Sequence, residues 1–125
     1  MITGVGIDIV HIPRLERITK RWNNRFLHRI FTREELAYVR KKSRPAMSLA
    51  GFFAAKEATV KAIGTGFSQG ITFLEIYVKH DNRGRPMISI SGKALEAASA
   101  SGASQWHLSI SHDAEYAVAT VIMEG

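Results

Sequence analysis

Residues 49–63 read LAGFFAAKEATVKAI, and the pattern of this stretch decides the fold. At about 100° per residue, one face of the predicted helix carries large apolar side chains, namely Leu49, Phe52, Phe53, Val60 and Ile63. The opposite arc carries only small residues, namely Ala50, Gly51, Ala54, Ala55, Ala58 and Ala62. Because small residues allow close approach and that arc has no long charged side chain, we expect a helix that is buried nearly all round.

Three charged residues interrupt this otherwise uncharged helix. Lys56 falls near the centre of the large apolar face, whereas Glu57 and Lys61 lie four residues apart at its edge. A buried charge is costly unless it is paired or binds a ligand. Glu57 and Lys61 form either an ordinary i,i+4 ion pair or part of a metal–phosphate site, where a neighbouring lysine is common. The pattern alone leaves both interpretations open.

A strand is predicted over residues 2–10 because side chains alternate there between two faces. Asp8 shares a face with Gly4 and Gly6, which would allow a second element to approach it closely. Asp8 is then either hydrogen-bonded to a nearby loop or a ligand of a hard metal ion together with Glu57. Magnesium is commonly held by one or two carboxylates, substrate phosphates and water. Taken alone, the residues favour the first interpretation.

Turn and capping signals divide the rest of the chain into elements. Thr32 and Glu35 have the spacing of a capping box that opens a helix, and Ser48 is a candidate cap for the central helix. Two shorter helical stretches precede Thr32, one after Pro13 and one around Phe26. Strands are predicted over residues 72–79, 86–90, 105–111 and 115–123, with a helix over residues 93–100. Helices first and antiparallel hairpins later favour an α+β fold, with an antiparallel sheet packed on the long buried helix.

Two glycine-containing segments allow a structural and a functional interpretation. Gly64-Thr65-Gly66 has the spacing of a helix C-cap, but its backbone could also approach a phosphate. Residues 82–86 read NRGRP and fit a hairpin turn, although Arg83 and Arg85 could hold a phosphate there.

Length and composition bound the class of protein. The 125 residues fit a single domain, 1–125. The chain has no cysteine, so disulfides and thiolate metal sites are excluded. No run approaches the roughly 18 apolar residues that a membrane helix needs, and the first ten residues lack the features of a signal peptide. A soluble cytoplasmic protein is the default expectation.

The positive charge is concentrated in one segment. The chain has a net charge of +6, and residues 14–44 contain eleven Lys or Arg against three Glu, a local charge of +8. An acidic partner is therefore expected at this segment, and nucleic acid, an anionic membrane or an acidic protein would all fit. A nucleic-acid-binding module explains the charge, but not the carboxylates and lysines in apolar surroundings, and no known binding motif is present.

Other enzyme classes lack their signatures. Ser109, Ser111 and His112 do not indicate a serine nucleophile, because no G-x-S-x-G elbow is present. The five histidines lack the H-x-x-x-H spacing of a zinc site, and no Walker-type loop supports another magnesium-dependent nucleotide enzyme such as a phosphatase.

Several segments together resemble the 4′-phosphopantetheinyl transferase family. Residues 6–10 read GIDIV and residues 53–62 read FAAKEATVKA, similar to the two signatures of that family. The segments FTREEL (31–36), GTG (64–66), NRGRP (82–86) and SISHD (109–113) resemble its small bacterial type. The resemblance runs nearly end to end and implies the trimeric 4′-phosphopantetheinyl transferase-like fold.

The resemblance also implies a reaction and its site. Coenzyme A would donate 4′-phosphopantetheine to a serine of apo-acyl carrier protein, in support of fatty acid biosynthesis, with release of adenosine 3′,5′-bisphosphate. Asp8 and Glu57 would hold magnesium (Mg²⁺) on the pyrophosphate, and Glu57 or a metal-bound water would take the serine proton. Coenzyme A would lie in clefts of a homotrimer, against Lys61, Gly64, Thr65, Gly66, Arg85, Pro86, Ser111 and His112. Lys61 and Arg85 would come from different subunits.

The family's partner suits the basic segment. Acyl carrier proteins are small and acidic, so this resemblance implies that the basic segment binds one rather than nucleic acid or a membrane. The residues expected to dock the carrier are Arg14, Arg17, Arg21 and Arg25, with Phe26 and Phe53 adding apolar contacts. Lys56, at the centre of the apolar face, is expected to have a buried positioning role distinct from that of Lys61.

Overall fold

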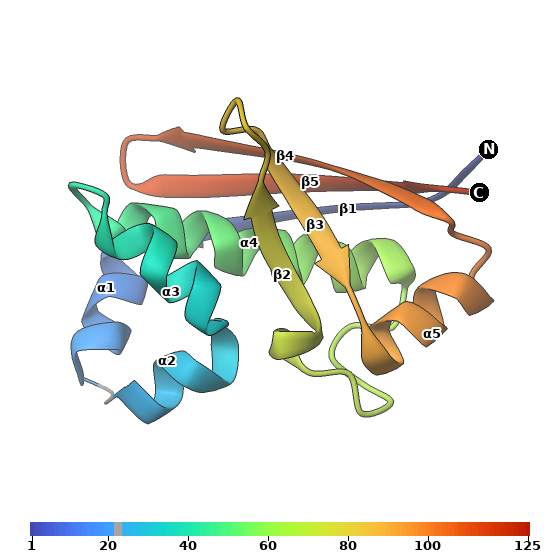
Figure 1. The fold of residues 1–125 in the computed structure, drawn as a ribbon, viewed down its shortest axis with the longest axis horizontal. Helices are drawn as coiled ribbons and strands as arrows, with labels where there is room; N and C mark the ends of the chain where they lie inside the picture. Colours follow the sequence, from blue (N-terminus) through green and yellow to red (C-terminus); the bar gives the residue numbers. More distant parts are fainter. Residues whose placement is uncertain (22–23) are drawn as a thin grey trace.

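The computed structural model describes residues 1–21 and 24–125, and its elements mix helices with antiparallel strands (Figure 1). The helices are α1 (Ile12–Arg21), α2 (Asn24–Ile30), α3 (Arg33–Arg40), α4 (Pro45–Ile63) and α5 (Gly92–Ala100), with a short 3-10 turn, η1 (Phe73–Glu75). The strands are β1 (Ile2–His11), β2 (Ile76–His80), β3 (Pro86–Ile90), β4 (Gln105–Asp113) and β5 (Tyr116–Glu124). The predicted α+β class is confirmed.

The first and last strands of the chain share one antiparallel sheet. Its order is β1-β5-β4, so β1 and β4 are the two edges. Asp8 on β1 pairs with Ala119 on β5, which pairs in turn with Ile110 on β4. A second antiparallel sheet contains β2 and β3. Strands that are far apart in the sequence therefore flank each other, and the chain ends lie on the same sheet.

Helix α4 lies between the two sheets, and β2 and β3 cross it in Figure 1. Its small-residue arc packs on β1 and β5. A Cβ atom added at Gly4 would overlap the carbonyl oxygen of Ala62, and one added at Gly6 would overlap that of Ala58. Strand and helix backbones touch there, which is a contact that only glycine permits.

The opposite face of α4 packs on the hairpin β2–β3 and on α3. Phe52, Val60 and Ile63 are buried on it, as are Ile76 and Val78 of β2. The helix is thus covered on both sides, which confirms the prediction that it is buried nearly all round. Lys56 is also fully buried in this face.

Two predicted boundaries are wrong, each for a local reason. The central helix begins at Pro45 rather than after a Ser48 cap, because proline fits the first helical turn, where its missing N–H is not needed. The strand predicted to begin at residue 72 begins at Ile76, since Thr72 and Glu75 form a capping box on η1. The capping box predicted for Thr32 and Glu35 is confirmed.

The outer face of the three-stranded sheet carries an apolar patch on β1 and β5 that is exposed in the single chain. On β1, the side chains that point away from α4 are Val5, Ile7 and Ile9, and these residues are 58%, 59% and 62% exposed. Ile122 of β5 is also exposed. We call these four residues the outer sheet face.

Candidate active site

Asp8 and Lys61 meet where β1 crosses α4. The Lys61 ammonium donates hydrogen bonds to Asp8 Oδ1 and to the backbone carbonyl of Ile7, both at 3.0 Å. The Asp8 side chain is only 18% exposed, whereas that of Lys61 is 52% exposed. Asp8 reaches the helix because Gly4 and Gly6, on the same face of β1, let the backbones touch. The structure therefore joins two residues that lie more than fifty positions apart.

Glu57 lies beside this pair, and the charges of Asp8 and Lys61 change the pKa of its carboxyl. Burial raises the pKa of the Glu57 carboxyl, the negative charge of Asp8 raises it further, and Lys61 partly opposes both effects. The two carboxylates line one cavity of about 300 Å³, together with Arg14 of α1 and Phe53, which lies one turn before Glu57. A strand carboxylate, a helix carboxylate and the Arg14 guanidinium thus line one space, and Lys61 bonds the first of these carboxylates.

The donor set of this cavity fits magnesium better than a transition metal. Among residues 1–21 and 24–125, no group of three or more His, Cys, Asp or Glu side chains is arranged to hold a metal ion. Asp8 and Glu57 offer two hard oxygen ligands. The pKa of Glu57 is raised first by burial and then by the charge of Asp8, and a bound cation would oppose both effects. Two carboxylates complemented by substrate phosphates and water are a common magnesium arrangement.

The Gly64–Gly66 segment ends α4 three residues after Lys61. The amides of Gly64 and Gly66 both donate to the Val60 carbonyl, at 3.0 and 3.3 Å, so the predicted C-cap is confirmed. Both glycines have positive φ angles, of 97° and 62°, and a Cβ atom at either would meet no atom within 4 Å. Left-handed backbone rather than crowding therefore favours glycine here. The Thr65 hydroxyl donates to the Gly66 carbonyl at 2.9 Å.

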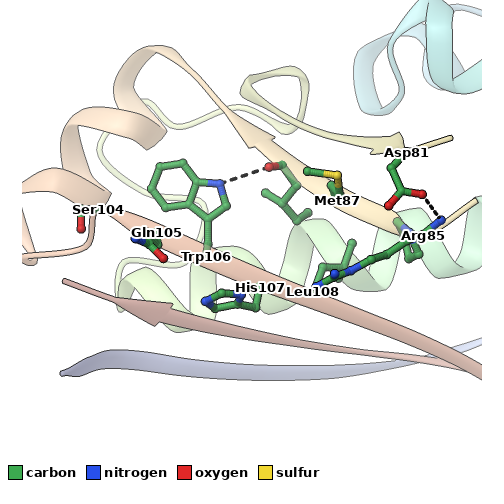
Figure 2. A pocket seen from close by; sticks show the side chains of 10 residues that line it. Asp81, Arg85, Met87, Ser104, Gln105, Trp106, His107 and Leu108 are labelled. Atoms are coloured by element: carbon green, nitrogen blue, oxygen red, sulfur yellow. Dashed lines mark hydrogen bonds between the residues drawn. The ribbon is translucent and has the colours of Figure 1, made fainter. Parts of the chain in front are cut away.

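Arg85 and Pro86 lie beside β4, an edge strand of the three-stranded sheet, and Figure 2 labels Arg85 there. They line a cavity of about 680 Å³ between β3 and β4, together with Asp81 and Trp106. The carboxylate of Asp81 accepts the backbone N–H groups of Arg83 and Arg85, at 2.8 and 2.9 Å, and so shapes the hairpin turn. The Trp106 indole donates to the Ile88 carbonyl at 3.1 Å and ties the hairpin to β4.

The predicted residues of β4 point to opposite faces of the sheet. His112 Nε2 lies 3.2 Å from the Met47 carbonyl, and His112 shares a small cavity of about 170 Å³ with Gly51 and Pro86. Ser111 is exposed, and alternation turns its side chain to the outer side of the sheet. Within one chain, Arg85, Pro86 and His112 are therefore grouped at β4, and Asp8, Glu57 and Lys61 are grouped at β1.

The expected docking arginines border the carboxylate cavity. Arg14, Arg17 and Arg21 line a surface cavity of about 430 Å³ on α1, together with Ile18. Arg14 also lines the cavity of Asp8 and Glu57, so the two spaces are neighbours. Arg25 and Phe26 lie on α2, and Phe26 packs against the core.

In the described part of the chain, no helix is both long and apolar enough to cross a membrane.

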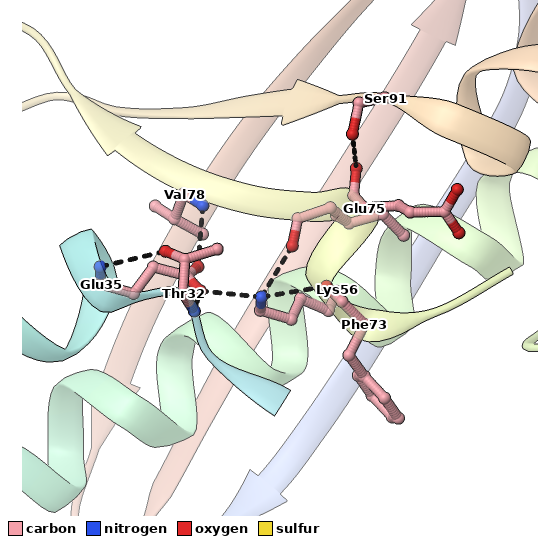
Figure 3. Close-up of polar contacts among 8 residues, drawn as sticks. Thr32, Glu35, Lys56, Phe73, Glu75, Val78 and Ser91 are labelled. Carbon is pink, nitrogen blue, oxygen red and sulfur yellow. Dashed lines mark hydrogen bonds and ion pairs between the residues drawn. The ribbon is translucent and has the colours of Figure 1, made fainter. Parts of the chain in front are cut away.

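Glu35 is the residue near the site that the sequence did not reveal. Its carboxylate forms a fully buried ion pair with Lys56, with 2.8 Å between Nζ and Oε1 (Figure 3). The capping box with Thr32 already accounted for Glu35, so the sequence carried no further signal of a second partner 21 residues away. Only the polarity of Lys56 inside an apolar face indicated that some buried anion must exist.

Known proteins share this architecture along its whole length. Residues 4–121 match the model of a family described as the 4′-phosphopantetheinyl transferase superfamily. A protein of Trichlorobacter lovleyi named holo-[acyl-carrier-protein] synthase is 48% identical over 124 residues, which cover 99% of this chain and 98% of that protein.

Two solved structures are similar in fold. The crystal structure of holo-[acyl-carrier-protein] synthase from Neisseria meningitidis aligns with a TM-score of 0.90 at 36% identity and covers 100% of both chains. The crystal structure of the Helicobacter pylori holo-[acyl-carrier-protein] synthase in complex with coenzyme A aligns with a TM-score of 0.83 at 36% identity. That alignment covers 96% of this chain and 99% of the other.

The chain has a helix between two antiparallel sheets, and a strand aspartate contacts the K-E-x-x-x-K segment of that helix. It belongs to the 4′-phosphopantetheinyl transferase superfamily, a class of group-transfer enzymes. Within that superfamily, the relatives that it matches over nearly its full length are named holo-[acyl-carrier-protein] synthases. The family predicted from the sequence motifs is confirmed.

Proposed function

We propose that this chain transfers 4′-phosphopantetheine from coenzyme A to a serine of apo-acyl carrier protein in the cytoplasm, in support of fatty acid biosynthesis. The observation that carries the proposal is the cavity shared by Asp8 and Glu57, with Arg14 on its rim and Lys61 bonded to Asp8. Residues 1–125 act as one catalytic unit in this proposal. The products are the holo-carrier and adenosine 3′,5′-bisphosphate.

The proposal assigns a role to each charged group in the cavity. Asp8 and Glu57 would hold Mg²⁺, which when bound would neutralise the pyrophosphate of coenzyme A. Lys61, which bonds Asp8 at 3.0 Å and is half exposed, would contact the phosphate oxygens, whose charge grows in the transition state. The serine oxygen forms a bond to the phosphorus of the phosphopantetheine group, and the bond from that phosphorus to the bisphosphate leaving group breaks. Glu57 or a water beside it would accept the serine proton.

The carrier docks on α1 and α2 in this account. Arg14, Arg17 and Arg21 supply a positive surface next to the carboxylate cavity, with Arg25 on α2 extending it. Phe26 and Phe53 add apolar contacts at the border of that surface. An acidic carrier helix on these residues would bring its serine to the cavity of Asp8 and Glu57. Such steering weakens as salt is added.

Assembly completes the site by joining the two groups of residues. The outer sheet face (Val5, Ile7, Ile9, Ile122) is an apolar surface that the single chain leaves exposed, and covering it with further copies in a homotrimer would remove it from water. Asp8, Glu57 and Lys61 lie at one edge of the sheet, and Arg85 and Pro86 lie at the other. Coenzyme A then binds between copies, with its pyrophosphate at the first edge and its nucleotide at the second. Ser111, His112 and the Gly64–Gly66 backbone contribute further contacts.

Transfer is tested by the intact mass of the acceptor. Apo-acyl carrier protein is incubated with the chain, coenzyme A and Mg²⁺, and the carrier is weighed by mass spectrometry. We expect the carrier to gain one phosphopantetheine, and we expect no gain with chelator or with a carrier whose acceptor serine is replaced by alanine. An unchanged carrier mass across a series of metals and pH values would refute the proposal.

A further inference from the structure

Glu35 and Lys56 form a polar hub in the middle of the core (Figure 3). The Lys56 ammonium uses all three of its protons, donating to Glu35 Oε1 at 2.8 Å, to the Phe73 carbonyl at 3.1 Å and to the Ile76 carbonyl at 2.7 Å. The Glu35 carboxylate also accepts the backbone N–H of Thr32 at 2.8 Å and that of Val78 at 2.9 Å. The hub therefore joins α3, α4, η1 and β2.

Stability does not account for this hub. Both side chains are fully buried, and the burial of Lys56 lowers its pKa against the opposing effect of Glu35. Replacement of a buried ion pair by apolar residues of similar volume is often neutral or stabilising, because the charges no longer have to be stripped of water. Apolar packing is not directional, whereas hydrogen bonds depend on the orientation of their partners. The bonds of Lys56 can therefore fix both the rotation and the translation of α4.

Helix α4 needs such a directional contact because the face that packs on the sheet carries only small side chains. On the sheet side, the helix rests on Gly4 and Gly6 through Ala58 and Ala62, which offer no large side chains that would interlock. Lys56 is the residue directly before Glu57, so any rotation of α4 that relaxes one moves the other. A rotation of about 10° would displace a side-chain tip about 5–6 Å from the helix axis by about 1 Å.

The hub also fixes the wall of the carboxylate cavity. Lys56 bonds the carbonyl of Phe73, whose ring stacks on Phe67 at 3.9 Å between centroids and lies 5.6 Å from the ring of Phe53. Phe53 lines the cavity of Asp8 and Glu57. One ammonium is thus bonded directly beside Glu57 in the helix and to the residue whose ring joins the aromatic side chains of the cavity wall.

We propose that Glu35 and Lys56 are positioning residues, which hold α4 at the rotation that brings Glu57 to Asp8. This inference rests on the proposed function for its activity readout, but not for its metal-binding readout. A misplacement of the order of 1 Å is enough to cost about 100-fold in rate. The pair touches neither coenzyme A nor the carrier and acts only through the geometry of Glu57.

The test replaces the pair by apolar residues, as Glu35→Leu with Lys56→Met. We expect this double variant to unfold at a urea concentration at or above that of wild type. We also expect kcat for transfer to fall about 10- to 100-fold, with less than a threefold change in the KM for coenzyme A. Binding of Mg²⁺ alone, followed by calorimetry, should weaken about tenfold, since residues that orient metal ligands affect affinity on this scale.

Two further variants separate positioning from general stability. Thr32→Ala removes a methyl group and the hydroxyl that accepts the Glu35 N–H at 3.2 Å, but it leaves the Glu35–Lys56 ion pair in place. It should therefore lower the unfolding midpoint and leave kcat and Mg²⁺ affinity unchanged. Glu35→Gln keeps an acceptor for Lys56 but turns an amide NH2 toward the Val78 N–H, so it should lower the unfolding midpoint. The folded protein should keep kcat within about threefold of wild type, because Lys56 still has its bond to α3.

Several results would overturn the inference. One is a folded double variant whose kcat and Mg²⁺ affinity are both unchanged. Another is a double variant that fails to fold, because the pair would then be needed for stability. A loss of kcat in Thr32→Ala or Glu35→Gln as large as in the double variant would also contradict it. If wild type transfers nothing, the proposed function fails, and the Mg²⁺ titrations still decide the positioning role.

Discussion

Asp8 attracts one charged neighbour, Lys61, and repels the other, Glu57. It is bonded to Lys61, and its charge helps to raise the pKa of Glu57. The residues alone favoured a hydrogen-bonded, structural aspartate. The structure shows such a bond, to Lys61, and also shows the shared cavity with Glu57 that a metal ligand requires. The long-range contact between β1 and α4 thus brings together, at one residue, the observed hydrogen bond and the position of the proposed metal ligand.

Asp8→Asn tests the proposed metal ligand. The amide is nearly isosteric but carries no charge, so we expect the transfer rate at saturating Mg²⁺ to fall about 100-fold or more. Glu96→Gln, on the exposed surface of α5, is the matched control and should retain the wild-type rate. Equal rates for Asp8→Asn and wild type would rule out Asp8 as a ligand.

At the scale of elements, the period of α4 and the turn signals predicted most of the fold, because both are local properties of the sequence. The burial of the helix over residues 49–63, the capping box at Thr32 and the hairpin whose second strand begins at Pro86 were all predicted in this way. The pairing of Glu35 with Lys56 was not, since it depends on how α3 and β2 pack on α4. The strand order β1-β5-β4 was also inaccessible, because apolar alternation specifies faces and not neighbours.

Gly6→Ala tests the close contact between β1 and α4. The added methyl group would overlap the Ala58 carbonyl oxygen, so strand and helix must separate. We expect a loss of about 3 kcal/mol in the free energy of unfolding, at the upper end of the usual cost of overpacking. Urea denaturation measures it, with the exposed Thr3→Ala on the same strand as control. A loss below about 0.5 kcal/mol, the usual range of surface substitutions, would mean that the helix does not rest on this glycine.

The turn that holds Arg85 should depend on pH through Asp81. The backbone N–H groups of Arg85 and Arg83 lower the pKa of Asp81 below its usual 3.8. A carboxyl with a lowered pKa stabilises the folded turn above its usual pKa and loses that effect as the pH falls through the lowered value. We expect the amides of Arg83 and Arg85 to exchange faster in Asp81→Asn than in wild type at neutral pH, as measured by NMR. Unchanged exchange of both amides would contradict this account of the turn.

At the scale of the whole molecule, one chain does not assemble the proposed site. The magnesium ligands lie on β1 and α4, whereas Arg85 lies beyond β4 at the other edge of the sheet. The sequence contained no local signal of this separation, and the trimer was predicted only from the family resemblance. The outer sheet face gives that prediction a physical basis, because exposed apolar patches are common at protein–protein interfaces.

Val5→Asp tests this interface. A carboxylate in the middle of an apolar contact would have to be buried without a partner, so we expect the variant to stay folded but to sediment as a monomer. Its transfer activity should fall with its assembly. Leu95→Asp, at an exposed apolar position on α5, is the matched control and should assemble as wild type does. A Val5→Asp protein of wild-type size would place the interface elsewhere.

The most direct measurement is the recovery of activity when two inactive variants are mixed. Asp8→Asn and Arg85→Ala are each expected to transfer little phosphopantetheine alone, as judged by the mass of the carrier. If one copy supplies Asp8 and its neighbour supplies Arg85, co-assembly after joint refolding restores up to about one quarter of the wild-type rate, because random assembly places both intact residues at one interface in four. A mixture no more active than the average of the two variants would contradict a site shared between copies.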